Sequence, residues 1–125
     1  SSPTVKLDRA KQAVQHTGQG VPQAEGEVRT ELDQRQVRVP GYVVPVDGNE
    51  ETVSSFLLVP FFGACIHVPP PPSNQIIYVT LREPVAVDEL WDAVWVYGTL
   101  HTTRTSHELA NSGYQMQGIR VESYE

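Results

Sequence analysis

Two patterns of hydrophobic and polar positions divide the chain. Within residues 4–15, apolar side chains recur every three or four positions, at Leu7, Ala10 and Val14. This is the spacing of one helix face, and Ser2-Pro3 just before it suits a helix start. The stripe is narrow, so we expect a short helix that packs weakly, or only on a partner. Residues 17–26 have the composition of a linker.

From residue 27 the pattern changes to the β-branched, partly alternating runs of strands. Six segments fit, over residues 28–32, 36–46, 52–59, 76–81, 93–103 and 113–124. Residues 88–92 suit one helical turn, and residues 103–112 a polar loop. In the last segment, period two places Ile119 and Val121 on one side and Tyr114, Met116 and Tyr124 on the other.

Five or six strands joined by short turns predict a mainly β protein. The fold we expect is a small five- to six-stranded OB-like barrel with a short N-terminal helix; a small sandwich is the alternative. A length of 125 residues fits one domain, with residues 1–26 as helix and linker and residues 27–125 as the OB-like β domain. Its aromatic side chains are expected mostly in the core.

Charge and composition exclude several classes of function. The net charge is −6, and residues 41–125 carry three Lys/Arg against ten Asp/Glu. Nucleic-acid binding needs a basic face, as does adhesion to an anionic membrane, so neither partner is expected.

No run of about 18 apolar residues exists, so no transmembrane segment is predicted. One cysteine allows no intrachain disulfide. The chain starts Ser-Ser-Pro, as a processed form would, so the lack of a leader does not indicate the cytoplasm.

Cys65-Ile66-His67 is the first candidate for chemistry. In an extended backbone, residues two apart share a face, so a thiol and an imidazole would be neighbours. Zinc or copper accepts both ligand types but needs one or two more. A thiolate activated by the imidazole would instead be a nucleophile or redox sensor. The structural alternative makes Cys65 a small core residue and has His67 bond to a loop carbonyl.

Histidines elsewhere could complete a metal shell. His101 follows an apolar strand position and His107 lies in the polar loop, so both are candidate metal ligands, with solvated side chains as the alternative. The His-Glu-x-x-His spacing is missing, as are a Gly-rich phosphate loop and a Gly-x-Ser-x-Gly elbow. No known catalytic signature is therefore present.

The run of four prolines is the second candidate. Pro69, Pro70, Pro71 and Pro72 favour an extended polyproline rod. Such a rod can be a ligand for an aromatic groove, or a rigid crossing that holds its flanks still. Asn74 and Gln75 then offer side-chain amides that either cap the next strand or face a ligand.

The central run resembles the signature of a bacterial family of unknown function. The matching pieces are Val37–Pro45, Phe56–Pro60, Phe62–Gln75, Val94–Leu100 and Gly113-Tyr114, so the resemblance covers about residues 27–125. It implies a protein exported by Gram-negative bacteria, periplasmic or anchored as a lipoprotein, and often found beside ABC-type transport components; some relatives are linked to zinc supply. It implies no catalytic residues, and Cys65 lies too deep in the fold to carry a lipid.

We therefore predict a non-enzymatic periplasmic accessory protein. It would bind zinc, copper or a small ligand through Cys65, His67 and either His101 or His107, in the service of an envelope transporter. The alternative is an interaction module that docks a membrane transport component through its proline-rich loop, with Cys65 and His67 purely structural. An enzyme that uses Cys65 as nucleophile is the third hypothesis.

Overall fold

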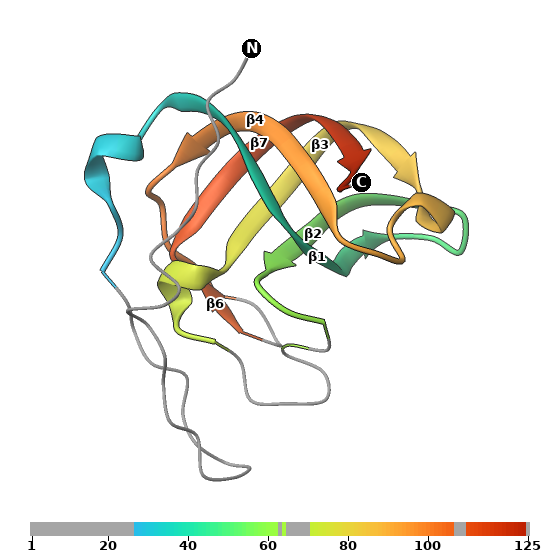
Figure 1. Cartoon of the computed structure of the whole chain (residues 1–125), viewed down its shortest axis with the longest axis horizontal. Helices are drawn as coiled ribbons and strands as arrows, with labels where there is room; N and C mark the ends of the chain where they lie inside the picture. The colour runs from blue at the N-terminus through green and yellow to red at the C-terminus, as the bar shows by residue number, and fades with distance from the viewer. Residues whose placement is uncertain (1–26, 63, 65–70, 107–109, 125) are drawn as a thin grey trace, which may run out of the picture.

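A computed structural model describes residues 27–62, 64, 71–106 and 110–124 (Figure 1). Five long strands form a closed barrel in the order β1-β2-β3-β7-β4. Their bounds are β1 Arg35–Gly48, β2 Thr52–Val59, β3 Ile77–Ala86, β4 Val94–His101 and β7 Tyr114–Ser123. All neighbours are antiparallel except β3 and β7, which are parallel. A meander of three strands, with the fifth long strand between the third and fourth, is the OB arrangement. The predicted mainly β, OB-like class is confirmed; the predicted N-terminal helix lies outside the described residues.

β1 closes the barrel because it pairs with two strands in succession. Arg35–Gly41 pairs with β4, and Tyr42–Gly48 pairs with β2. The change of partner falls at Gly41, where a Cβ atom would lie 2.7 Å from the carbonyl oxygen of Val59. A glycine therefore lets β1 bend closely over β2 as it passes from one partner to the other.

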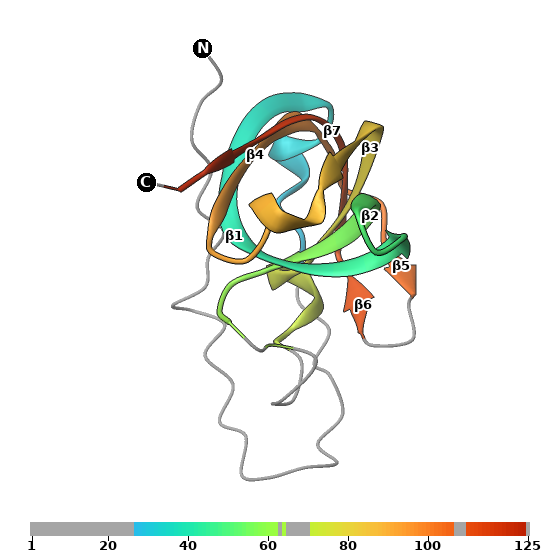
Figure 2. The same ribbon diagram turned by 90° about the vertical axis from the view of Figure 1, so that its right-hand side faces the viewer.

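Alternation along the strands fills the barrel. Val37, Val39, Phe56, Leu58, Ile77, Val79, Val94, Val96, Leu100, Tyr114 and Met116 point inward, and each is at most 1% exposed. The one-turn 3₁₀ helices η2 (Thr30–Leu32) and η4 (Val87–Glu89) lie at opposite ends of the barrel (Figures 1 and 2). Leu32 and Leu90 join the core from these two ends, so both ends of the barrel are covered.

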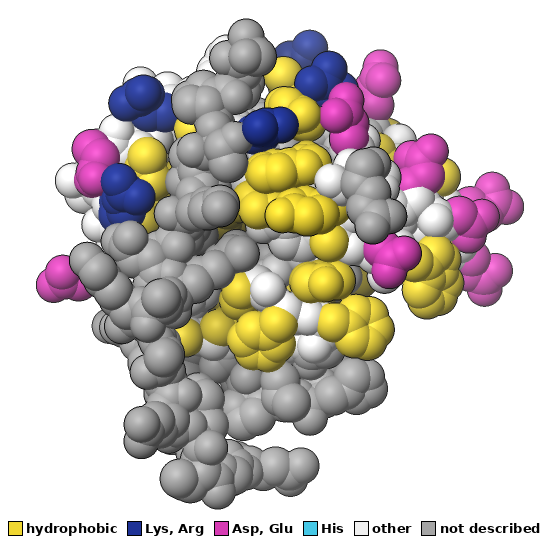
Figure 3. Space-filling view, in the orientation of Figure 1, with side chains coloured by type: hydrophobic (Ala, Val, Ile, Leu, Met, Phe, Trp, Pro, Cys, Tyr) yellow, Lys and Arg dark blue, Asp and Glu magenta, His cyan; other side chains and the backbone are white. Residues whose placement is uncertain are grey.

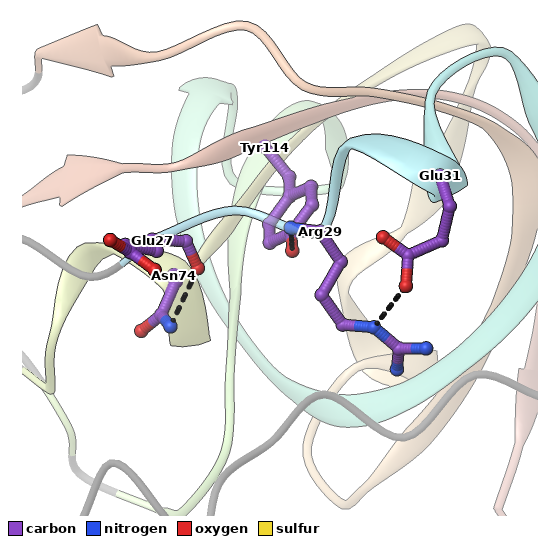
Figure 4. A network of polar contacts seen from close by, with 5 residues as sticks. All are labelled: Glu27, Arg29, Glu31, Asn74 and Tyr114. Atoms are coloured by element: carbon purple, nitrogen blue, oxygen red, sulfur yellow. Dashed lines mark hydrogen bonds and ion pairs between the residues drawn. The ribbon is translucent and has the colours of Figure 1, made fainter.

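A short strand was predicted over residues 28–32, and this is wrong for residues 27–32 as the structure describes them. The segment instead ends in η2 and is held by backbone contacts with later elements (Figure 4). The N–H of Arg29 donates to the hydroxyl of Tyr114 at 2.6 Å, and Nδ2 of Asn74 donates to the carbonyl of Glu27 at 3.0 Å. On the surface, Arg29 pairs with Glu31 at 3.0 Å. A backbone hydrogen bond, and then Arg29, lower the pKa of the Glu31 carboxyl.

The last strand departs from simple alternation. Tyr97 pairs with Arg120 but the next residue, Gly98, pairs with Gly118, so Ile119 is an extra residue in β7. This β-bulge shifts the phase by one. Ile119 is 76% exposed, whereas Val121 packs against the core beside Tyr114 and Met116. The prediction that Val121 shares a side with Ile119 is therefore wrong.

The aromatic side chains are mostly not in the core, contrary to expectation. Only Phe56 and Tyr114 are fully buried. Figure 3 shows apolar side chains gathered on the face that carries β1 and β4, bordered by charged ones. There the guanidinium of Arg38 lies 4.4 Å from the ring centre of Trp95, which stacks on Tyr124 at 5.1 Å. Arginine stems and paired rings thus cover part of this apolar area.

Candidate functional site

One end of the barrel, here called the loop end, gathers most of the buried polar side chains. It consists of the end of β2, the 3₁₀ helix η3 (Ser73–Gln75), the start of β3, the end of β4 and the small hairpin of β5 (Thr105–Ser106) and β6 (Asn111–Ser112). The buried polar residues described are Ser55, Ser73, Asn74, Gln75 and Ser112. All but Ser55 lie at the loop end, because η3 contacts β6 there.

Hydrogen bonds join η3 to segments that are distant in sequence. The N–H of Gly113 donates to the carbonyl of Ser73 at 2.7 Å, and Nη1 of Arg104 donates to Oγ of Ser73 at 3.3 Å. A Cβ atom on Gly113 would lie 3.0 Å from that same carbonyl oxygen. The glycine therefore permits the close approach, and η3 is fixed between the hairpin and residues 27–29.

Several polar atoms at the loop end are buried but have no hydrogen-bond partner in the described structure. They are Oδ1 of Asn74, Oε1 and Nε2 of Gln75, and Nε2 of His101. Gln75 is 2% exposed. Leaving a buried donor or acceptor unpaired costs about 1–3 kcal/mol. Such groups are uncommon in folded proteins and often mark a role other than stability.

An apolar cluster on the outer face of β1, β2 and β3 joins the two loops of the loop end. Ala64, from the β2–β3 connection, and Ala110, from the β5–β6 hairpin, both pack in it. Its other buried members are Val44, Leu57, Val59 and Ile76. The cluster therefore holds the residue just before Cys65 and the residue that follows positions 107–109 against the same sheet face.

His101 lies on the continuation of this outer face around the barrel. It pairs with Gln115 of β7, Gln115 pairs with Tyr78 of β3, and Tyr78 pairs with Leu57 of β2. Cross-strand partners share a face. Nε2 of Gln115 donates to Oγ1 of Thr105, which ties the hairpin to this row. His101 is half-buried and lies one strand away from the hairpin that leads to His107.

The other predicted site residues divide into two groups. Cys65, His67, Pro69, Pro70 and His107 lie outside the described residues. Pro71, Pro72, Asn74 and Gln75 are described, and all four are buried. No three His, Cys, Asp or Glu side chains come together within the part of the chain that is described. His101 is thus the only predicted metal ligand whose place is known.

Sequence reasoning missed four residues of the loop end: Ser73, Arg104, Ser112 and Gln115. Residues 103–112 were expected to be a polar loop, but they contain the β5–β6 hairpin, whose pairing places Ser112 opposite Thr105. Gly113 was the available signal, since a glycine before a strand often marks close backbone approach. Within the described residues, no helix is long and apolar enough to cross a bilayer.

The fold and the loop end define a small OB-type β-barrel domain with a candidate binding end. The chain belongs to the family of proteins of unknown function DUF3299, whose model matches residues 3–123. The match begins well before residue 27, so the likeness also includes the N-terminal segment that sequence reasoning placed outside it. A crystal structure of a DUF3299 family protein from Pseudomonas aeruginosa is similar, with 48% identity and a TM-score of 0.78. The alignment covers 82% of this chain and 70% of that one. Among curated proteins, none matches this sequence.

Proposed function

We propose that this protein is a non-enzymatic binding protein whose ligand is held at the loop end of the barrel. The observation that carries the proposal is the set of buried polar atoms without partners on Asn74, Gln75 and His101. A domain under selection for stability alone would replace such groups by apolar ones of similar volume. A ligand that bonds to them would recover the cost of their burial.

A metal ion, zinc or copper, is the ligand that the residue types favour. Ala64 directly precedes Cys65, Ala110 comes three positions after His107, and both alanines pack in one cluster. Cys65 thiolate and His67 would supply two ligands, and His101 or His107 would complete the shell. His101 has a buried ring nitrogen, Nε2, that is free to coordinate. Coordination needs a deprotonated thiol and a neutral imidazole, so affinity should fall as the pH is lowered.

The cellular role that we propose follows from the family resemblance. The resemblance implies relatives that are exported and that often lie beside ABC-type transport components. This supports a role as a periplasmic accessory protein of an envelope transporter. In a longer precursor, a lipid anchor outside this chain would hold it at the membrane.

Metal content tests the proposal directly. Purified protein is stripped, reloaded with zinc or copper, desalted and measured by mass spectrometry, with Cys65→Ser, His67→Ala and His101→Ala beside it. We expect one bound metal in the wild type and a loss of at least about tenfold in affinity for each variant. His16→Ala, in the N-terminal segment, is the matched control and should bind normally.

Binding of cobalt(II) gives a second readout, which does not depend on measuring the metal content of the protein. A thiolate ligand produces a charge-transfer band, which should be present in the wild type and absent in Cys65→Ser. Binding far below one metal per chain and equal in all variants would overturn the metal site.

One observation favours a second candidate, an interaction module. Phe61 directly precedes the signature run and Phe62 opens it, and the two side chains are 43% and 72% exposed. The rings of Phe62 and Tyr42 meet edge to face, with ring centres 5.9 Å apart. Exposed neighbouring aromatics are typical of protein contacts. In this case the loop would dock a membrane transport component, and Cys65 and His67 would serve the core.

Thiol reactivity separates the two candidates. A core Cys65 should be alkylated only on unfolding, and Cys65→Ala should mainly lower the melting temperature. A metal-binding Cys65 should be alkylated in the stripped folded protein and protected by zinc. Rapid alkylation near pH 6 would instead support the third hypothesis, a nucleophilic thiol.

A further inference from the structure

The far half of β7 has an open edge. β3 and β7 pair from Ile77 with Tyr114 as far as Leu81 with Gly118, and no described strand pairs with that side of β7 beyond this point. The bulge at Ile119 is the cause, because an extra residue bends a strand and ends its pairing. Figure 2 shows that β3 and β7 diverge beyond the stretch in which they are paired. Among the described strands, β4 is the one that pairs with residues 120–123.

β3 moves away at the same place. Thr80 pairs with Ser55, and the next pair is Val85 with Val53. Between these two pairs β3 advances by five residues while β2 advances by two. This irregular stretch contains Pro84, which has no N–H to donate. The proline therefore hinders a further strand from pairing with the edge of β3, as prolines do on the edge strands of many proteins. The edge of β7 has no proline, and towards its end Asp88 and Glu89 of η4 line a pocket together with Val121, Glu122 and Ser123.

The opening between the strands is lined by apolar and uncharged polar side chains, two arginines and Glu83. Two adjoining grooves, of about 380 and 240 Å³, share Leu81, Arg82, Gly118 and Ile119. Arg82 and Arg120 are both exposed, and they are two of the three basic residues in positions 41–125. Arg120 also pairs with Glu122 and lies over Tyr97. The lining of the two grooves carries two arginines and one glutamate, a net positive charge in an otherwise acidic domain.

We propose that the β7 edge, residues 119–123, is a docking site for an extended acidic segment of a partner protein. The segment would add as a strand, because only extended backbone can satisfy a row of free N–H and C=O groups. Alternate apolar side chains would cover Ile119 and Leu81, and alternate carboxylates would meet Arg82. The site lies on the half of the barrel away from the loop end, so a partner and a ligand could be bound together.

Amide exchange with a defined probe tests the proposal. The probe is acetyl-Val-Glu-Val-Glu-Val-Glu-amide, added to the full chain while backbone exchange is followed by NMR. We expect slower exchange confined to residues 119–123 and their surroundings. The same peptide with every amide nitrogen methylated, or with Lys in place of Glu, should not slow exchange.

Charge reversal locates the site. Arg82→Glu should weaken binding of the probe by about tenfold or more, because the substitution replaces attraction by repulsion at the mouth of the groove. Arg35→Glu, an exposed residue at the start of β1, is the matched control and should change binding less than about twofold. Ile119→Asn removes an exposed contact and should weaken binding without loss of folding.

Two results would overturn the proposal. One is unchanged exchange at 119–123 under saturating probe, or an equal response of the two charge variants. The other is protection of 119–123 that rises with protein concentration alone, together with a dimer in sedimentation, which would assign the edge to a second copy of this chain.

Discussion

Replacing Gln75 by methionine should make the protein more stable. Gln75 is 2% exposed, and neither Oε1 nor Nε2 has a partner in the described structure. Each unpaired buried polar atom costs about 1–3 kcal/mol, and a side chain of similar shape costs less than about 1.5 kcal/mol in packing. Two such atoms cost about 2–6 kcal/mol, so the balance for Gln75→Met is a gain of at least about 0.5 kcal/mol in the free energy of unfolding.

Urea and thermal unfolding measure this gain. For a domain of this size, about 1 kcal/mol corresponds to a rise of about 4 °C in melting temperature. Gln115→Met is the matched control, because Nε2 of Gln115 donates to Thr105. That variant should lose about 1 kcal/mol. Opposite signs for two Gln→Met changes at one end of the barrel would show that pairing, not polarity, decides the effect.

A loss of stability in Gln75→Met would refute the reasoning. It would mean that the amide has a structural partner and that its burial is no sign of a ligand. If stability rises, the variant should also bind the metal or small ligand of the loop end less tightly, because the bonds that recover the burial cost are gone.

Two further predictions concern close packing in the barrel. Gly98→Ala should destabilise the protein by about 2 kcal/mol or more in urea unfolding, because a Cβ would lie 2.2 Å from the carbonyl oxygen of Gln117 and force β4 and β7 apart; a change below about 0.5 kcal/mol would contradict this contact. Tyr114→Phe should cost about 1–2 kcal/mol, because it leaves the N–H of Arg29 without its acceptor. Tyr97→Phe, whose hydroxyl bonds to Glu122 on the surface, is its control and should cost less than about 0.5 kcal/mol; equal losses in the two would argue against the buried bond.

The local sequence pattern predicted the strands well where apolar and polar residues alternate, because the alternation then indicates which residues lie on each face of the strand. The predicted strand over residues 52–59 has the bounds of β2, and the predicted strand over residues 93–103 contains β4, in which Val94, Val96 and Leu100 are buried. These elements are specified by period two and by turn residues at their ends. The OB-like class followed from the number and spacing of such runs.

Errors arose where tertiary contacts override local pattern. Residues 28–32 look like a short strand, but η2 forms because Leu32 enters the barrel end and Arg29 bonds to Tyr114. The bulge at Ile119 has only an indirect sign in the sequence, the glycines at 98 and 118, which turn out to be cross-strand partners. Which strands pair in parallel depends on closure of the barrel, and no local run encodes that.

The candidate site was partly accessible from sequence. Asn74 and Gln75 were singled out for their amides and His101 for its imidazole. That their polar atoms are buried without partners could be learned only from the packed structure. The shared cluster of Ala64 and Ala110 was likewise invisible, because small apolar residues in loops carry no pattern.

The double pairing of β1 has a consequence for how the chain assembles. β1, β2 and β3 follow one another as hairpins and can form as soon as residue 86 is available. The first half of β1, however, finds its partner only in β4, where Val39 faces Val96. Pairing across such a sequence separation is slow, and domains dominated by it fold in about milliseconds to seconds. Until then the early edge of β1 is exposed to other chains, so a chaperone that shields residues 35–41 would raise the yield of refolding more than one that shields any later strand.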